Sequence, residues 1–135
     1  MNPVAKPSML LLDTHLVLWS AFDPGRLSAK ARRILQSRES PLAFSLATLW
    51  EVAIKTSLGR PDFVVDPRRL HDGLLTAGFQ EIQILAGHLV RVASLPWVHR
   101  DPFDRLLVAQ AMDERITLLT VDPTLAGYGR SVRVV

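Results

Sequence analysis

The chain has 135 residues, 48% of them hydrophobic, which is enough for one ordinary domain with a buried core, and we expect a single domain over 1–135. It has no cysteine, which excludes disulfides, thiolate metal sites and cysteine nucleophiles and favours a cytoplasmic location. The formal net charge is only +3, but thirteen of the sixteen basic residues are arginine, whose side chain suits phosphate best. Nucleic acid is therefore a candidate partner.

The first segments alternate between short apolar runs and helical patterns. "MLLL" before Asp13 predicts a buried strand, and "HLVLWSAF" predicts a helix that "DPG" ends. This apolar region is too short to span a bilayer, so we expect no signal peptide, no transmembrane helix and no membrane partner. "SAKARRILQS" then predicts a helix that starts at Ser28, and "PLAF" predicts the next strand.

A further helix covers "SLATLWEVAIKTSLGRP", where Ser45 is the candidate N-cap and Gly59 marks the stop. Its apolar positions include Leu49, Val52 and Ala53. The following segments predict a helix at "PRRLHDGLLTAG", a strand at "EIQIL" and a helix at "AGHLVRVASL".

The last third of the chain predicts a helix beginning near Asp101, a strand "ITLLTV" ending at Asp122, and an edge strand "VRVV". Strands and helices thus alternate along the chain. This order predicts an α/β fold with a mostly parallel central sheet and helices on both faces, arranged in three layers.

Acidic residues fall where such a fold gathers functional groups, at the carboxyl ends of strands and the helix starts that follow them. Asp13 and Asp122 each end a predicted strand, while Glu51 and Asp104 lie in the first turns of helices. Carboxylates about 4 Å apart repel by roughly 1 kcal/mol in water and about 4 kcal/mol at an effective dielectric near 20. We therefore expect a cation among them, and an oxygen-rich set favours Mg²⁺ or Mn²⁺ over zinc.

Local structural roles compete with this interpretation. In "HRDPFDRLLVAQA", Asp101 fits an N-cap, Pro102 fits the first helical position, and Asp104 fits the third, where the helix dipole favours a negative charge by about 0.3 to 1 kcal/mol. A strand-end turn at Asp13, an Asp-Pro turn at Asp122 and a solvated helix face for the acid at position 51 also remain open.

Four motifs, taken together and in order, resemble the PIN-domain ribonucleases and, within them, the VapC-like toxins of toxin–antitoxin pairs: "LLLDTHLVLW", "SLATLWEVAIK", "LPWVHRDPFDRLLVAQA" and "LLTVD". The resemblance runs over nearly the whole chain and implies a PIN-like fold. It implies that Asp13, Glu51, Asp104 and Asp122 bind Mg²⁺ or Mn²⁺ and cleave RNA by metal-assisted hydrolysis, with Asp101 in support. It also implies a cognate antitoxin whose C-terminal segment lies in a groove and blocks the site.

Charge and hydropathy agree with these partners. Setting aside five site acids leaves eight acids against sixteen basic residues, a balance of +8. The candidates for phosphate contact are Arg32, Arg33, Arg68, Arg69, Arg100 and Arg105, although solvated helix faces explain any single one equally well. The mean hydropathy of +0.18 is high for a domain of this size and fits an antitoxin and a homodimer that cover apolar surface.

Several other side chains receive local interpretations. Thr14, Ser45 and Thr120 stand at the same rim, where they either bind a ligand or cap the backbone. His99 is expected to be a hydrogen-bonded loop residue with a possible RNA contact, and His15 to be a core or groove residue. Core packing is the favoured role for most of the tryptophans, Trp19, Trp50 and Trp97, and a surface covered by an antitoxin or a second copy is the alternative.

Other functions fit the sequence less well. A haloacid-dehalogenase phosphotransferase needs a second aspartate two residues after the first, where His15 stands, and a receiver domain needs a late lysine, whereas the last lysine is Lys55. A PIN-like module that binds RNA or protein without cleaving it remains the alternative, and a DNA nuclease is the third. The RNA target, the cleavage position and the number of metal ions are not readable from the sequence.

Overall fold

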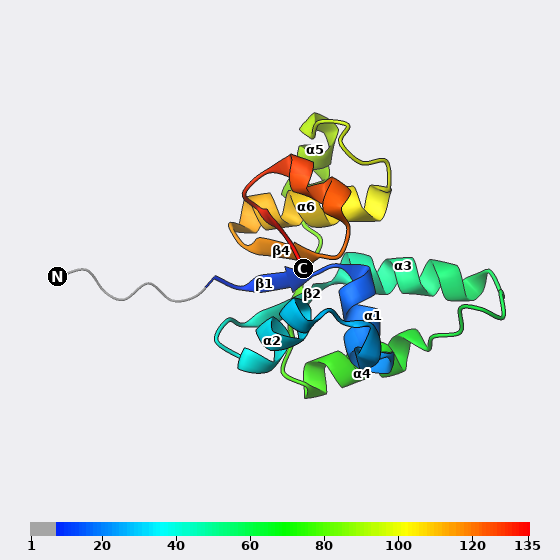
Figure 1. Ribbon diagram of the computed structural model, residues 1–135. Coiled ribbons are helices and arrows are strands. Elements are labelled where there is room, and N and C mark those ends of the chain that lie inside the picture. Colours follow the sequence, from blue (N-terminus) through cyan, green and yellow to red (C-terminus); the bar gives the residue numbers. More distant parts are fainter. Residues whose placement is uncertain (1–7) are drawn as a thin grey trace.

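The computed structural model describes residues 8–135 and has a parallel sheet at its centre (Figure 1). All five strands run in the same direction, in the order β3-β2-β1-β4-β5. The strands are β1 (Leu10–Leu12), β2 (Leu42–Ser45), β3 (Gln80–Ile82), β4 (Thr117–Thr120) and β5 (Val132–Val134). The predicted fold class is confirmed, and "VRVV" does form the edge strand next to β4.

Helices cover both faces of this sheet, as Figure 1 shows, with α1, α2 and α4 on one side and α5 and α6 on the other. The helices are α1 (Thr14–Phe22), α2 (Ala29–Ser37), α3 (Leu46–Ser57), α4 (Pro67–Thr76), α5 (Ala86–Ser94) and α6 (Pro102–Glu114). Two short 3₁₀ helices, Pro24–Arg26 and Pro123–Tyr128, follow α1 and β4. None of the helices in the described part of the chain is long and apolar enough to cross a bilayer.

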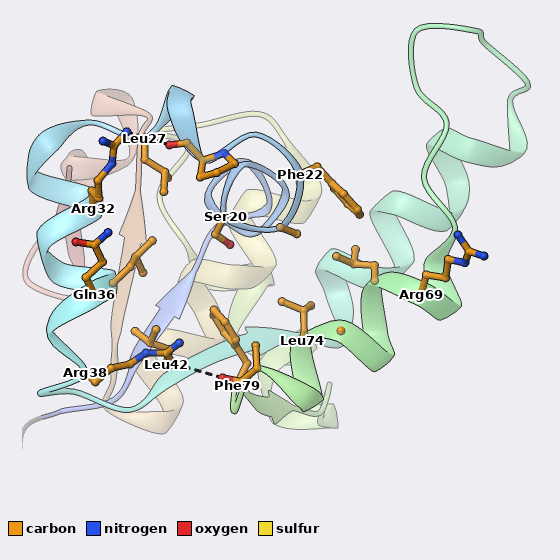
Figure 2. Close-up of a pocket in the computed structure, with 16 residues that line it drawn as sticks. Ser20, Phe22, Leu27, Arg32, Gln36, Arg38, Leu42, Arg69, Leu74 and Phe79 are labelled. Atoms are coloured by element: carbon orange, nitrogen blue, oxygen red, sulfur yellow. Dashed lines mark hydrogen bonds between the residues drawn. The ribbon is translucent and has the colours of Figure 1, made fainter.

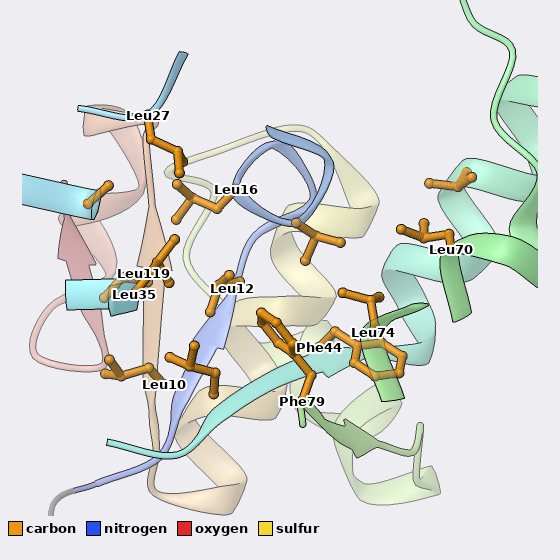
Figure 3. Close-up of a cluster of buried hydrophobic side chains, with 14 residues drawn as sticks. Leu10, Leu12, Leu16, Leu27, Leu35, Phe44, Leu70, Leu74, Phe79 and Leu119 are labelled. Carbon is orange, nitrogen blue, oxygen red and sulfur yellow. The ribbon is translucent and has the colours of Figure 1, made fainter. Parts of the chain in front are cut away.

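The two faces of the sheet bury separate hydrophobic clusters because side chains alternate along each strand. Leu10 and Leu12 point into the cluster under α1, α2 and α4, which Figure 3 shows, whereas Leu11 packs against α6. On β4, Leu119 and Leu118 divide between the faces in the same way. Burial on both faces explains why the strands read as continuous apolar runs in the sequence.

The helix starts match the capping signals. Ser28 accepts a hydrogen bond from the backbone of Ala31, and Ser45 accepts one from Ala47, so both serines cap their helices as predicted. Ser45 is fully buried, and its hydroxyl also donates to Gln110 Oε1 over 2.6 Å. The hydroxyl is buried and its only hydrogen is donated to Gln110, so it has no hydrogen to donate to a ligand at the rim.

Two local expectations were wrong in detail. The strand expected at "EIQIL" lies earlier, at Gln80–Ile82, and the rest of that segment leads into α5. On α3, Ala53 is exposed, while Val52 and Glu51 are buried. The helix therefore turns a carboxylate, rather than a third apolar side chain, toward the interior.

Candidate metal centre

Asp13 follows β1 directly and is almost fully buried at the carboxyl end of the sheet. Its Oδ1 accepts a hydrogen bond from the backbone of Leu16 (2.8 Å), which caps α1. Its Oδ2 accepts from Thr120 Oγ1 (2.6 Å) and from the backbone of Val121 (3.1 Å). A carboxylate has about four acceptor sites, so these three bonds leave one on Oδ1 for a further ligand. Burial raises the pKa of Asp13 in spite of the hydrogen bonds, which act in the opposite direction.

Glu51 is connected to the Asp13 region by a hydrogen bond from Thr14, the residue that follows Asp13 in the chain. The Thr14 hydroxyl donates to Glu51 Oε1 over 2.8 Å, and since a hydroxyl has one hydrogen, it must accept from Thr48 in the 3.0 Å contact between the two threonines. Lys55, one turn further along α3, donates to Glu51 Oε2 over 2.6 Å. Glu51 is thus a buried, oriented carboxylate and not a solvated face residue.

Asp104 lies in the first turn of α6, where Asp101 caps the helix. Oδ1 of Asp101 accepts from the backbone of Phe103 (2.8 Å) and of Asp104 (3.1 Å), so the capping role expected for Asp101 is confirmed. The pKa of Asp104 is raised from an ordinary 3.8 to about 7, first by burial, then by the negative charges of Asp101 and Asp13, with a smaller rise from Glu51; His99 acts against these. Three neighbouring acids, Asp101, Asp13 and Glu51, therefore act electrostatically on Asp104.

Asp122 ends the segment after β4 and caps the second 3₁₀ helix through its bond from the backbone of Thr124 (2.9 Å). Its Oδ2 lies 2.8 Å from His99 Nε2, which is itself 3.8 Å from Asp104 Oδ2. Partial desolvation acts to raise the pKa of Asp122, but the hydrogen bonds from Thr124 and His99 outweigh it and lower the pKa.

These contacts join the four acids through short links. Thr120 donates to Asp13 and accepts from the backbone of Asp122 (3.0 Å), which couples the ends of β1 and β4. Within residues 8–135, one ligand atom each from His99, Asp104 and Asp122 lie within 4.8 Å of one another, and Asp13 and Glu51 are outside that group. The Asp13 and Glu51 carboxylates face this group closely enough to influence Asp104.

The donor set fits a hard divalent cation. Carboxylate oxygens dominate this set. Burial and the charges of the neighbouring acids raise the pKa of Asp104 to about 7, and a cation would relieve the repulsion among the carboxylates. Acceptor sites remain free on the carboxylates of Asp13, which caps α1, and Glu51, on α3. Such a set suits Mg²⁺ or Mn²⁺.

From the sequence, His99 was placed near the site but was not included among the candidate site residues. Its position two residues before the Asp101 cap was the available signal, because that spacing puts it at the same sheet edge as Asp104. Lys55 was also missed, although a lysine four residues after a helical glutamate is a recognised pairing.

Arg105 was wrongly included among the phosphate contacts. It is buried, and its guanidinium donates to the backbone oxygens of Pro96 (2.9 Å), Val92 (3.1 Å) and Leu95 (3.3 Å). A side chain that serves three carbonyl groups inside the protein is a structural one. The other candidate arginines are exposed: Arg32, Arg33, Arg68, Arg69 and Arg100.

The expectations for several aromatic residues were also wrong. Trp50 is 54% exposed and Trp97 is 80% exposed, so neither belongs to the core, whereas Trp19 packs partly against it. Trp50 contacts the ring of Phe103 edge-on at 4.9 Å between centroids. His15 is exposed and lies 5.7 Å from the Trp19 ring, so it is not a core residue.

A separate apolar hollow of about 680 Å³ lies on the α1, α2 and α4 side of the sheet (Figure 2). Its lining includes the apolar side chains of Leu74 and Phe79 and the basic side chains of Arg32, Arg38 and Arg69. The four site acids do not line it. The hollow is therefore separate from the metal centre, and its lining suits the binding of apolar side chains.

Known proteins share this fold. The family model of the PIN domain matches residues 10–130. One similar structure is VapBC2 from Rickettsia felis bound to a DNA fragment from its promoter. It matches this chain with a TM-score of 0.67 at 13% sequence identity, and the match covers 94% of this chain and 97% of that one. A toxin–antitoxin complex from Klebsiella pneumoniae has a TM-score of 0.63 at 19% identity over 93% and 96%. VapBC-5 from Mycobacterium tuberculosis has a TM-score of 0.59 at 16% identity over 96% and 98%. Among curated proteins, none matches the sequence significantly.

Proposed function

The chain belongs to the PIN-domain family, and we propose on this basis that it is a metal-dependent endoribonuclease that acts as the toxin of a toxin–antitoxin pair. The observation that carries the proposal is the group of carboxylates at the end of the sheet, where burial and the charges of Asp101, Asp13 and Glu51 raise the pKa of Asp104. Capping alone explains neither this repulsion nor the burial of Asp13 and Glu51.

We propose that Asp13, Glu51, Asp104 and Asp122 hold Mg²⁺ or Mn²⁺. When bound, such a cation supplies Lewis-acid activation of water and stabilises the charge that develops on a phosphate. The protein's own contribution is orientation, because the Thr14 and Thr120 hydroxyls fix the Glu51 and Asp13 carboxylates before a substrate arrives.

RNA is the proposed substrate because of the charge distribution. Outside the acidic centre the chain carries a balance of +8, and exposed arginines on α2, α4 and the loop before α6 are available to phosphates. Intracellular RNA would also be accessible to a protein with the cytoplasmic location that the absence of cysteine favours.

An antitoxin is the proposed protein partner. The structural neighbours include complexes described as toxin–antitoxin pairs, and the hollow between α1, α2 and α4 offers an apolar surface of suitable size for a peptide segment. We propose that apolar side chains of the antitoxin occupy this hollow and that its end reaches the acids.

A homodimer is proposed from the exposed apolar side chains. Trp50 and Ile54 on α3 and Leu89 and Val90 on α5 remain accessible in the isolated chain. A second copy would bury some of this surface. We expect light scattering of the purified chain to give a mass of about twice the 15.0 kDa of one copy.

The test is incubation of the partner-free protein with total cellular RNA and Mg²⁺ or Mn²⁺, followed by sequencing of new RNA ends. We expect discrete ends that disappear with EDTA and in Asp104→Asn. Asp62→Asn, which changes an exposed acid outside the contacts of the centre, is the matched control and should cleave as the wild type does. No new ends from folded protein would favour the non-catalytic binding module, and cleavage of DNA alone would favour a DNA nuclease.

A further inference from the structure

His99 lies in the loop between α5 and α6 and is held at three atoms. Its backbone N–H donates to Tyr128 Oη (3.1 Å), its ring Nδ1 lies 3.1 Å from the backbone N–H of Asp101, and its Nε2 lies 2.8 Å from Asp122 Oδ2. The two ring nitrogens therefore face different kinds of group, a donor on one side and a carboxylate on the other.

These two contacts determine which ring nitrogen carries the hydrogen. A neutral imidazole has one N–H and one acceptor nitrogen. The Asp101 N–H is able only to donate, so Nδ1 must accept, and the hydrogen is then on Nε2, where it is donated to Asp122. A histidine that binds a metal ion through Nε2 needs the lone pair on that atom and normally donates from Nδ1. The backbone of Asp101 opposes that arrangement.

We propose that His99 is a positioning residue that donates from Nε2 to Asp122 and orients this carboxylate toward the acidic centre, and that it is not itself a metal ligand. The role of His99 in metal binding rests on the proposed function. The hydrogen bond itself depends only on the contacts of His99. The proposal accounts for the presence of a histidine within a set of oxygen ligands.

Arg105 and Tyr128 hold the loop that carries His99. Tyr128 Oη accepts from the His99 backbone and from Arg105 Nη1 (3.0 Å), while the guanidinium also donates to the oxygens of Val92, Leu95 and Pro96 around the end of α5. The exposed ring of Trp97 covers it, 4.0 Å from centroid to guanidinium carbon. The hydrogen bonds of Arg105 thus fix the loop, and the fixed loop places the His99 ring against Asp122.

The first test reads the His99 ring directly. Long-range ¹H–¹⁵N correlation spectra of the whole chain, labelled at histidine, distinguish the two neutral forms of each ring, and loss of one signal set in His99→Gln assigns His99. We expect the form with hydrogen on Nε2, both without metal and with saturating Mg²⁺. Hydrogen on Nδ1, or loss of the Nε2 hydrogen on addition of Mg²⁺, would overturn the proposal.

The second test compares two substitutions by Mn²⁺ calorimetry. Gln places an amide N–H near the position of Nε2, whereas Ala has no donor. We expect His99→Gln to bind Mn²⁺ within about threefold of the wild type and His99→Ala about tenfold more weakly, the usual size of an outer-shell effect. Equal weakening in both variants would indicate a lost ligand, and unchanged binding in His99→Ala would show that Asp122 needs no orienting partner.

Tyr128→Phe keeps the histidine and removes only the hydroxyl that holds its backbone, so it extends the test if His99→Ala fails to fold. We expect severalfold weaker Mn²⁺ binding by this variant at unchanged helical circular dichroism; wild-type affinity would contradict the role of the loop. Absence of Mn²⁺ binding and RNA cleavage in the wild type would refute the proposed function. The ring form of His99 in metal-free protein would still support or overturn the hydrogen bond.

Discussion

Asp104→Asn should stabilise the metal-free fold at neutral pH while removing the proposed activity. Burial and the neighbouring acids raise the pKa of Asp104 from 3.8 to about 7, so the ionised side chain is disfavoured in the folded protein. The full difference corresponds to about 4 kcal/mol. The side chain is 23% exposed, and solvent screening with the lost helix-dipole interaction reduces the expected gain to about 2 kcal/mol.

The pH dependence gives the sign of the contribution that Asp104 makes to the free energy of unfolding. Between about pH 4 and pH 7 the folded protein holds a proton on Asp104 that the unfolded chain has released, so this residue makes stability fall as pH rises through that range. Asparagine does not titrate. The gain from Asp104→Asn should therefore be near zero at pH 4 and complete above pH 7.

Thermal unfolding in EDTA at pH 4.5 and pH 8 measures this effect. We expect the melting temperature of Asp104→Asn to exceed that of the wild type by about 6 °C at pH 8 and to differ little at pH 4.5. The exposed Asp62→Asn is the control and should leave both values unchanged. A lower melting temperature for Asp104→Asn at pH 8 would refute the argument that the acids repel one another in the metal-free protein.

Three further predictions concern metal binding and buried polar groups. Mn²⁺ at one hundred times its dissociation constant should stabilise the wild type by about 2.7 kcal/mol, and the same concentration should stabilise Asp104→Asn less, as measured by melting temperature. Arg105→Ala should cost about 3 kcal/mol in urea unfolding because several buried carbonyl groups lose their donor, while Arg32→Ala, on an exposed face, should cost less than about 0.5 kcal/mol. Ser45→Ala should cost about 2 kcal/mol through the lost cap and the unpaired Gln110, and wild-type stability in that variant would contradict the buried bond.

The sequence alone identified the order of strands and helices, most of their bounds and the edge at which the acids lie. These features depend on short-range signals: Ser28, Ser45 and Asp101 cap helices within three residues of themselves, and an acid that follows an apolar run must lie at a strand end. The resemblance to PIN domains rested on the same local motifs, and the family match over 10–130 confirms it.

Tertiary structure decided the surroundings of individual side chains. Arg105 was expected at the surface, but the packing of α5 against α6 buries it and gives it carbonyl partners nine to thirteen residues earlier in the chain. Trp97 is exposed for the complementary reason, since it covers that guanidinium from outside. No local pattern separates these cases, because burial of a long side chain depends on which element packs over it.

The acidic centre depends on both local sequence signals and tertiary structure. The sequence placed Asp13 and Asp122 at the ends of strands, yet the bond that joins them, through Thr120, links residues more than one hundred positions apart and exists only because β1 and β4 are neighbours in the sheet. Likewise, the direction of the His99 hydrogen bond depends on the Asp101 backbone and the Asp122 carboxylate meeting at one ring. Residue identity and strand-end position are local properties of the chain, whereas hydrogen-bond direction and charge repulsion depend on distances that only the folded arrangement defines.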